Sequence, residues 1–223
     1  MANNTWLWWS SGKDSAWALH TLRRDPEVNL TALVTTVNAD ADRVAMHAVR
    51  TELLRMQADA LSLPLHLVEL PYPCPDGAYE TAAAELIAQA ELAGVTHMAF
   101  GDLYLEHIRA FREDLLAESV IEPVFPLWGL DTKKLARDMV DGGIVARLTC
   151  VNPELLDGRF AGRMYDHALL DELPEDVDPC AEGGEFHTFV SDSPDFSAPL
   201  AVVDGEIVQR DGVYFADVLP EVE

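Results

Sequence analysis

Short apolar runs rich in β-forming residues alternate with longer helical patterns through the first two-thirds of this 223-residue chain. Because a helix between two strands forms the crossover that parallel strands require, this alternation predicts an α/β fold. We expect a mainly parallel sheet of five or six strands, with helices on both faces. The expected strands are 6–10, 30–37, 65–70, 95–100, 123–127 and 144–151, and the expected helices are 15–24, 47–62, 77–93, 107–119 and 132–140.

The pattern changes after about residue 151. The stretch 174–184 is acidic and irregular, and short strands divided by turns follow it. Asp204-Gly205 and Asp211-Gly212 are dipeptides typical of hairpin turns. We therefore predict a main domain over residues 1–148 and a smaller C-terminal α+β region over residues 149–223.

Composition limits the classes of partner. The net charge of −24, from 39 acidic and 15 basic residues, would repel nucleic-acid phosphates, so no nucleic-acid partner is expected. No apolar run approaches the roughly 20 residues that span a bilayer, and the first residues lack a signal-peptide pattern, so we expect no membrane partner and a cytoplasmic protein. Cys74, Cys150 and Cys180 form no Cys-x-x-Cys pair, which argues against a zinc or disulfide framework.

A small-residue loop follows the first expected strand and opens the first expected helix. Backbone N–H groups at such a helix start bind anions, and hydroxyls and a lysine can add donors and charge. A serine-rich cap on an ordinary helix is the alternative that the spacing alone leaves open. We expect the lysine to lie in an exposed loop. The loop consists of Ser10, Ser11, Gly12, Lys13, Asp14 and Ser15.

This loop closely resembles the Ser-Gly-Gly-x-Asp-Ser loop of the PP-loop ATP pyrophosphatases. The resemblance extends over nearly the whole chain to the diphthine–ammonia ligase family. The other stretches that carry it are 47–65, Gly101-Asp102 followed by Arg109, 126–129, Gly158-Arg159 and the signature-like 182–190 (EGGEFHTFV). Several separated motifs in the same order make this resemblance far more specific than the loop alone.

The resemblance implies a sheet of the adenine-nucleotide-binding (HUP/PP-loop) type, in which residues 1–148 bind ATP and residues 149–223 bind the substrate. It implies an enzyme that adenylates a substrate carboxylate, releases pyrophosphate and transfers ammonia, as in diphthamide biosynthesis. The cofactors would be ATP and Mg²⁺, with Asp14 as the metal ligand, and the partners ammonia and a small-molecule or protein-borne carboxylate. The implied catalytic residues are Lys13, Asp14 and Glu185. The implied nucleotide-binding residues are Ser10, Ser11, Gly12, Lys13, Asp14, Ser15, Gly101, Asp102 and Arg109. The implied substrate-binding residues are Glu182, Gly183, Gly184, Glu185, His187 and Thr188.

Two positions depart from the family pattern. Ser11 stands where many members have glycine, and His187 replaces an acidic residue. A neutral or cationic histidine favours an anionic acceptor, such as a small or corrinoid-like acid, over the trimethylammonium of diphthine. An adenine-nucleotide sensor without turnover and a PP-loop tRNA-modifying enzyme are the alternative functions. A homodimer is compatible with the sequence.

Overall fold

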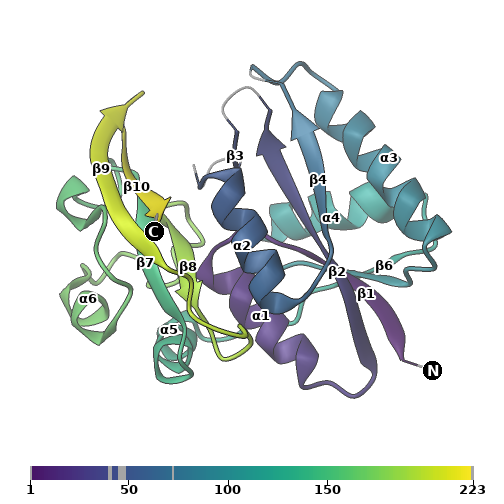
Figure 1. Ribbon diagram of the computed structural model, residues 1–223, viewed down its shortest axis with the longest axis horizontal. Coiled ribbons are helices and arrows are strands. Elements are labelled where there is room, and N and C mark those ends of the chain that lie inside the picture. Colours follow the sequence, from purple (N-terminus) through teal and green to yellow (C-terminus); the bar gives the residue numbers. More distant parts are fainter. Residues whose placement is uncertain (1, 40–41, 45–48, 72, 222–223) are drawn as a thin grey trace.

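The structure, a computed structural model, describes residues 2–39, 42–44, 49–71 and 73–221. Two sheets lie side by side, with helices packed around the first and short helices flanking the second (Figure 1). The strands are β1 Asn3–Trp8, β2 Val28–Asn38, β3 Arg43–Val44, β4 Leu65–Leu70, β5 His97–Ala99, β6 Glu122–Val124, β7 Val145–Val151, β8 Phe186–Asp192, β9 Val202–Arg210 and β10 Val213–Pro220. The helices are α1 Lys13–Arg23, α2 Thr51–Leu61, α3 Ala78–Leu92, α4 Glu106–Leu116, α5 Thr132–Asp141 and α6 His167–Glu172, with a 3₁₀ turn at Gly158–Phe160.

The first sheet is mainly parallel. β2 and β5 flank the central strand β1, β4 pairs with β2 and β6 with β5, all in parallel, whereas the short β3 pairs antiparallel with the end of β2. The chain therefore leaves β1 toward one side of the sheet and later returns to its other side at β5. Ligands of such sheets bind outside the carboxyl ends of the strands at this switch in order. The fold class predicted from the alternation is confirmed.

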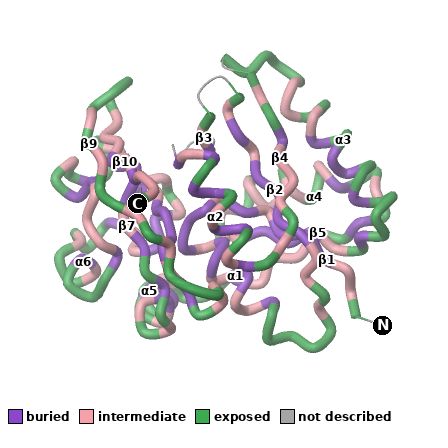
Figure 2. Tube along the Cα trace, viewed as in Figure 1, coloured by how far each residue is buried: buried purple, intermediate pink, exposed green. Residues whose placement is uncertain are grey.

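Neighbouring residues along the central strands face opposite sides of the first sheet. Leu7 and Leu33 belong to the core beneath α1 and α2, which continues into the second sheet. Trp6 and Val34 belong to a second core beneath α3 and α4. Both faces of these strands are buried (Figure 2). Side chains of successive residues point to opposite faces of the sheet, and both sets are apolar. This is what a parallel sheet covered by helices on both faces requires.

The second sheet is antiparallel, in the order β8-β7-β10-β9. Asp211 and Gly212 connect β9 to β10 with positive φ angles of 50° and 83°, which confirms the hairpin turn predicted there. The turn predicted at Asp204-Gly205 is wrong, because both residues lie within β9. A side chain at Gly205 would meet the Cβ of Asp217 at 2.9 Å, so this glycine serves close packing against β10, beside the register shift between Ala216 and Val218.

The expected helices and strands are found with shifted ends, and residues 47 and 48 of the predicted helix 47–62 lie outside the described residues. The short β3 was not predicted. Strand β7 lies in the second sheet, and the domain boundary after residue 148 stays a prediction. Among the described residues, no helix has both the length and the apolar character needed to cross a bilayer.

Candidate active site

The loop after β1 is held in a tight turn by its own serines. The Ser15 hydroxyl donates to the carbonyl of Gly12 (2.9 Å) and lies 3.1 Å from the Ser10 hydroxyl. Ser11 has a φ of 70°, in the left-handed region that favours glycine. That conformation accounts for glycine at the corresponding position of the resembling loop. Ser11 adopts it because its carbonyl is fixed by two bonds, from the Val190 backbone N–H (3.0 Å) and the Gln57 side-chain amide (3.1 Å).

Strand β8 of the second sheet forms part of the same site. The backbone N–H of Lys13 donates to the Thr188 hydroxyl (3.1 Å). A side chain at Gly12 would lie 3.1 Å from the Thr188 carbonyl, so only glycine lets the loop approach β8 this closely. Two segments separated by about 175 residues in sequence are thus joined at the start of α1.

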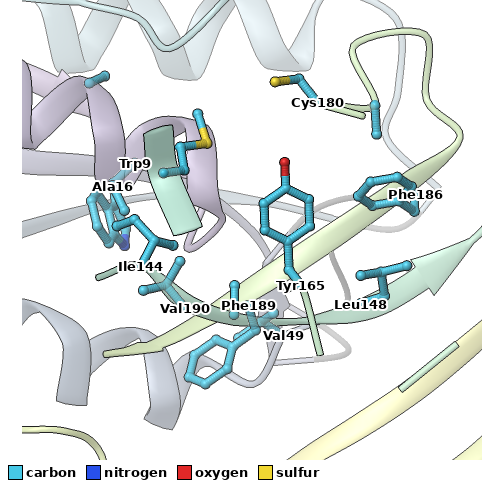
Figure 3. Packing of buried hydrophobic residues seen from close by; sticks show 14 of the residues in the cluster. Trp9, Ala16, Val49, Ile144, Leu148, Tyr165, Cys180, Phe186, Phe189 and Val190 are labelled. Atoms are coloured by element: carbon cyan, nitrogen blue, oxygen red, sulfur yellow. The ribbon is translucent and has the colours of Figure 1, made fainter. Parts of the chain in front are cut away.

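Lys13 is buried, with only 2% of its side chain exposed, so the exposed lysine expected from the sequence is wrong. Its ammonium donates to Asp14 Oδ2 (2.9 Å) and to the Cys180 carbonyl (2.5 Å). It also lies 5.5 and 5.3 Å from the ring centroids of Tyr165 and Phe186, which pack together beside Cys180 (Figure 3). The Lys13 side chain is buried because residues of the C-terminal region supply these partners.

Burial disfavours both charges of the Lys13–Asp14 pair. By itself it would lower the pKa of Lys13, but the nearby carboxylates of Asp14 and Asp178 raise that pKa above its ordinary value, so the lysine stays cationic. Burial raises the pKa of Asp14, against the opposing effect of the ammonium. The Oδ1 atom of Asp14 is buried and has no hydrogen-bond partner in the described part of the chain.

The segment 180–188 forms the wall of the site opposite the loop, and its first residues are held by Asp178. The Asp178 carboxylate accepts hydrogen bonds from the backbone N–H groups of Cys180 (3.1 Å) and Glu182 (3.0 Å). Its own N–H donates to Glu185 Oε1 (3.3 Å). The Glu182 carboxylate accepts from the backbone N–H of Leu103 (2.7 Å), which ties this wall to the loop after β5. Burial raises the pKa of Glu182.

A cavity of about 340 Å³ brings together eleven of the predicted site residues. Gly101 borders it where the chain leaves β5, and a side chain there would lie 3.2 Å from the Ser15 backbone nitrogen and cover it. The absence of a side chain thus keeps the start of α1 accessible to an anion. The predicted residues that line the cavity are Ser10, Lys13, Asp14, Ser15, Gly101, Asp102, Glu182, Gly183, Gly184, His187 and Thr188.

Four predicted site residues do not line this cavity. Ser11 and Gly12 lie behind the loop surface, and Glu185 lies behind Gly183, where an added Cβ would be 3.1 Å from the Glu185 carboxylate. Arg109 instead stacks on Phe125 and Trp128, each 4.9 Å away, and its Nε donates to Glu113 (2.8 Å). The nucleotide contact of Arg109 stays a prediction that this placement does not support.

Two residues that line or support the site were not predicted from the sequence. Arg112 lines the cavity and pairs with Asp102, with 3.3 Å between Nε and Oδ2. Gln57 is fully buried; it accepts from the Trp9 indole (2.9 Å) and donates to the carbonyls of Ser11 and Val190. A signal for Gln57 existed, because it falls among Leu53, Leu54, Ala58 and Leu61 on the apolar face of its helix. A polar side chain on such a face needs buried partners.

His187 lies on β8 with its side chain at the cavity wall. Burial, and to a lesser extent Lys13, lowers the pKa of His187 to about 4. The imidazole is therefore neutral near pH 7. Of the two forms considered from the sequence, neutral and cationic, the structure favours the neutral one. A neutral ring lacks the charge of the acidic residue that it replaces, but adds no positive charge for an anion.

The low pKa of His187 predicts an acid-sensitive contribution to stability. The unfolded chain binds a proton at His187 below about pH 6.5 and the folded chain only near pH 4. The stabilisation is therefore complete above pH 6.5 and is lost as the pH falls toward 4. Between pH 7.5 and 4.5, the free energy of unfolding should fall by about 2 kcal/mol more in the wild type than in His187→Gln.

Urea titrations at the two pH values measure this difference. His107→Gln, a change at an exposed histidine of α4, is the matched control. An equal acid loss in the wild type and in His187→Gln would show that the imidazole is protonated in the folded protein.

Comparisons with known proteins cover both halves of the chain. Residues 3–122 match the profile of the diphthamide synthase N-terminal domain, and residues 131–218 match that of the diphthamide synthase C-terminal domain. The two matches together include both walls of the cavity.

Individual relatives are distant. A diphthine–ammonia ligase of Schizosaccharomyces pombe is 34% identical over 90 residues, which is 38% of this chain and 14% of that protein. The diphthine–ammonia ligase of Danio rerio is 25% identical over 196 residues, 80% of this chain and 76% of that protein. The diphthine–ammonia ligase of Homo sapiens is 23% identical over 194 residues, 80% of this chain and 73% of that protein. The chain thus covers about three quarters of the animal proteins and a small part of the yeast protein.

Proposed function

This chain belongs to the diphthamide synthase family, and from that membership we propose that it is an ATP-dependent ligase that converts a substrate carboxylate into an amide with ammonia. The main support for the proposal is that two unlike walls line the same cavity. One wall is the phosphate-type loop with Lys13 and the start of α1; the other is the segment 180–188, from which the carboxylate residue Glu182 lines the cavity. ATP and an acceptor bound on these walls would meet in one cavity.

The reaction we propose has two steps. A carboxylate oxygen of the acceptor attacks the α-phosphorus of ATP, and the bond to pyrophosphate breaks. Ammonia then attacks the carbonyl carbon of the acyl-adenylate; AMP leaves, and the attacking nitrogen loses a proton to give the neutral amide. Adenylation is needed because a free carboxylate is a poor electrophile, and the intermediate divides one difficult step into two.

The protein would act mainly by positioning and by stabilising charge. The hydroxyl of Ser10 and the N–H groups at the start of α1 border the cavity and can donate to phosphate oxygens, whereas the Ser15 hydroxyl already donates to the Gly12 carbonyl. The ammonium of Lys13 is fixed by Asp14 and Cys180, so it would contribute positive charge at a set position rather than a mobile side chain. Preorganised donors of this kind need no reorganisation when charge develops.

Asp14 fits a magnesium ligand. Its Oδ1 is buried and lacks a hydrogen-bond partner in the described part of the chain, and a carboxylate oxygen is the type of ligand that Mg²⁺ prefers. The described residues contain no group of three acidic, histidine or cysteine side chains that could hold a metal. Asp14 would therefore be a single protein ligand, and Mg²⁺ would neutralise phosphate charge during pyrophosphate release.

The acceptor would lie against Glu182, Gly183, Gly184, His187 and Thr188. The relatives' names make diphthine, a carboxylate carried by a protein, the first acceptor to test. The neutral His187 cannot pair with a trimethylammonium group as a carboxylate could, so we retain the proposal that a different carboxylic acid is preferred.

Incubation with α-labelled ATP, ammonium and a panel of acids tests the function. The panel contains diphthine-bearing factor and small anionic acids, and each component is omitted in turn. The proposal expects AMP and pyrophosphate in equal amounts only when ATP, ammonium and an accepted acid are all present. Tight ATP binding without pyrophosphate release across the panel would indicate a nucleotide sensor instead.

A further inference from the structure

Arg112 lies on α4 where two cavities adjoin. It lines the main cavity and also a second cavity of about 380 Å³, which is bordered by the ends of β1, β2 and β4 and by α3 and α4. Trp8 and Ser10 are the other residues shared by the two cavities. A ligand that occupied both cavities would therefore lie close to Arg112.

The guanidinium of Arg112 is held in one orientation from several sides. Its Nε lies 3.3 Å from Asp102 Oδ2, and its Nη1 donates to the Tyr79 hydroxyl at 3.3 Å. The guanidinium carbon also lies between 5.0 and 5.7 Å from three ring centroids, those of Trp8, Phe100 and Phe111. An arginine fixed in this way loses little further side-chain entropy when it binds a ligand.

Arg112 supplies positive charge to a mainly acidic cavity. Among the described residues that line the main cavity, Asp14, Asp102 and Glu182 are carboxylates, and Lys13 and Arg112 are the basic partners. The ammonium of Lys13 is already bound to Asp14 and Cys180. The Nη2 of Arg112 has no hydrogen-bond partner in the described part of the chain, so it can donate to a ligand.

The second cavity also contains an unsatisfied polar group. Thr36 Oγ1 is buried at its wall without a hydrogen-bond partner among the described residues. The other walls are largely aromatic or aliphatic. Buried hydroxyls are normally paired, so this oxygen indicates a polar ligand rather than a dry cavity.

We propose that Arg112 binds a phosphate group of the nucleotide at the junction of the two cavities. A planar guanidinium with free N–H donors matches adjacent phosphate oxygens. This inference rests on the proposed function, since it takes ATP as the ligand. Arg112 would thus bind the nucleotide in place of Arg109, the arginine predicted from the sequence, which lies one turn earlier on the same helix.

Equilibrium titrations with ATP, inorganic pyrophosphate and adenosine test the contact in Arg112→Gln and Arg112→Lys. Arg112→Gln should bind ATP and pyrophosphate at least tenfold more weakly, about 1.4 kcal/mol, and adenosine within twofold of the wild type. The affinities of Arg112→Lys for ATP and pyrophosphate should lie between those of the wild type and of Arg112→Gln, because lysine keeps the charge and loses the planar fork. Arg137→Gln is the matched control, since Arg137 is a helical arginine paired with Asp171 that does not line the main cavity.

Several outcomes would overturn the proposal. Unchanged ATP binding in Arg112→Gln would overturn the Arg112 contact. The proposed ligase function would still be supported if the wild type released pyrophosphate. Equal losses for ATP and adenosine, or losses matched by a lower melting temperature, would show that Arg112 only supports the fold. Pyrophosphate binding that depends on Arg112, in a wild type that does not bind ATP, would support the phosphate contact and contradict the proposed function. A wild type that binds neither anion would overturn both.

Discussion

Replacing Lys13 by alanine is expected to lower the free energy of unfolding by about 3 kcal/mol and to weaken ATP binding at least tenfold. The reason for the first effect is burial: Lys13 has 2% of its side chain exposed and bonds to Asp14 and to the Cys180 carbonyl. Removing one partner of a buried pair leaves the other charge uncompensated. The second effect follows from the loss of positive charge beside the loop. Urea unfolding measures the first effect, and titration at a temperature where the variant is folded measures the second.

Two comparisons separate these effects. Adding Asp14→Asn to Lys13→Ala should recover part of the lost stability, because it removes the unpaired carboxylate, and should not recover ATP binding. Lys134→Ala is the control, since Lys134 is an exposed lysine paired with Asp138 on α5 and should change stability by less than about 0.5 kcal/mol. A stable Lys13→Ala protein with wild-type ATP affinity would contradict both the buried pair and the nucleotide site.

Replacing Glu185 by glutamine is expected to leave ATP affinity within twofold and to slow acceptor-dependent pyrophosphate release by about a hundredfold or more. Glu185 is buried, and its Oε1 accepts from the Asp178 backbone N–H. Its Oε2 has no partner in the described part of the chain, and a Cβ added at Gly183, which lines the cavity, would lie 3.2 Å from it. Glutamine keeps the shape and the Oε1 acceptor but removes the charge. Pre-steady-state pyrophosphate release with a saturating acceptor measures the effect.

A control variant and two alternative outcomes of Glu185→Gln distinguish a role in acceptor turnover from other roles of Glu185. Glu154→Gln changes an exposed carboxylate of the same region and should leave both quantities unchanged. Equal loss of ATP affinity and turnover in Glu185→Gln would place the segment 182–188 on the nucleotide side. Full turnover in Glu185→Gln would show that the side chain only holds the loop through Asp178.

Much of the first sheet could be predicted because each strand carries its own local signal. The run 65–70 became β4 with the predicted ends, and the alternation with helices implied parallel pairing. Asp204-Gly205 failed because a turn dipeptide and a glycine needed for close packing look the same in sequence. What distinguishes them is Asp217 on the neighbouring strand, a contact that no local window contains.

The site was predictable in its position and not in its detailed contacts. The loop and the segment 182–188 were identified separately, and the structure places them in one cavity. Arg109 and Arg112 lie three residues apart on one helix, and only the packing of α4 decides which of them faces the cavity. The burial of Lys13 likewise depends on Tyr165, Cys180 and Phe186, all more than 150 residues away.

In the proposed reaction, the carboxylate of the acceptor attacks the α-phosphorus of ATP. Transfer of oxygen from an acceptor labelled with ¹⁸O in its carboxylate tests this directly, because AMP departs with the oxygen that formed the bond to phosphorus. Mass spectrometry after reaction with ATP and ammonium should find one ¹⁸O in AMP for each amide formed, and none in pyrophosphate. Unlabelled AMP beside the amide, or ADP with the label in inorganic phosphate, would show that the carboxylate does not attack the α-phosphorus.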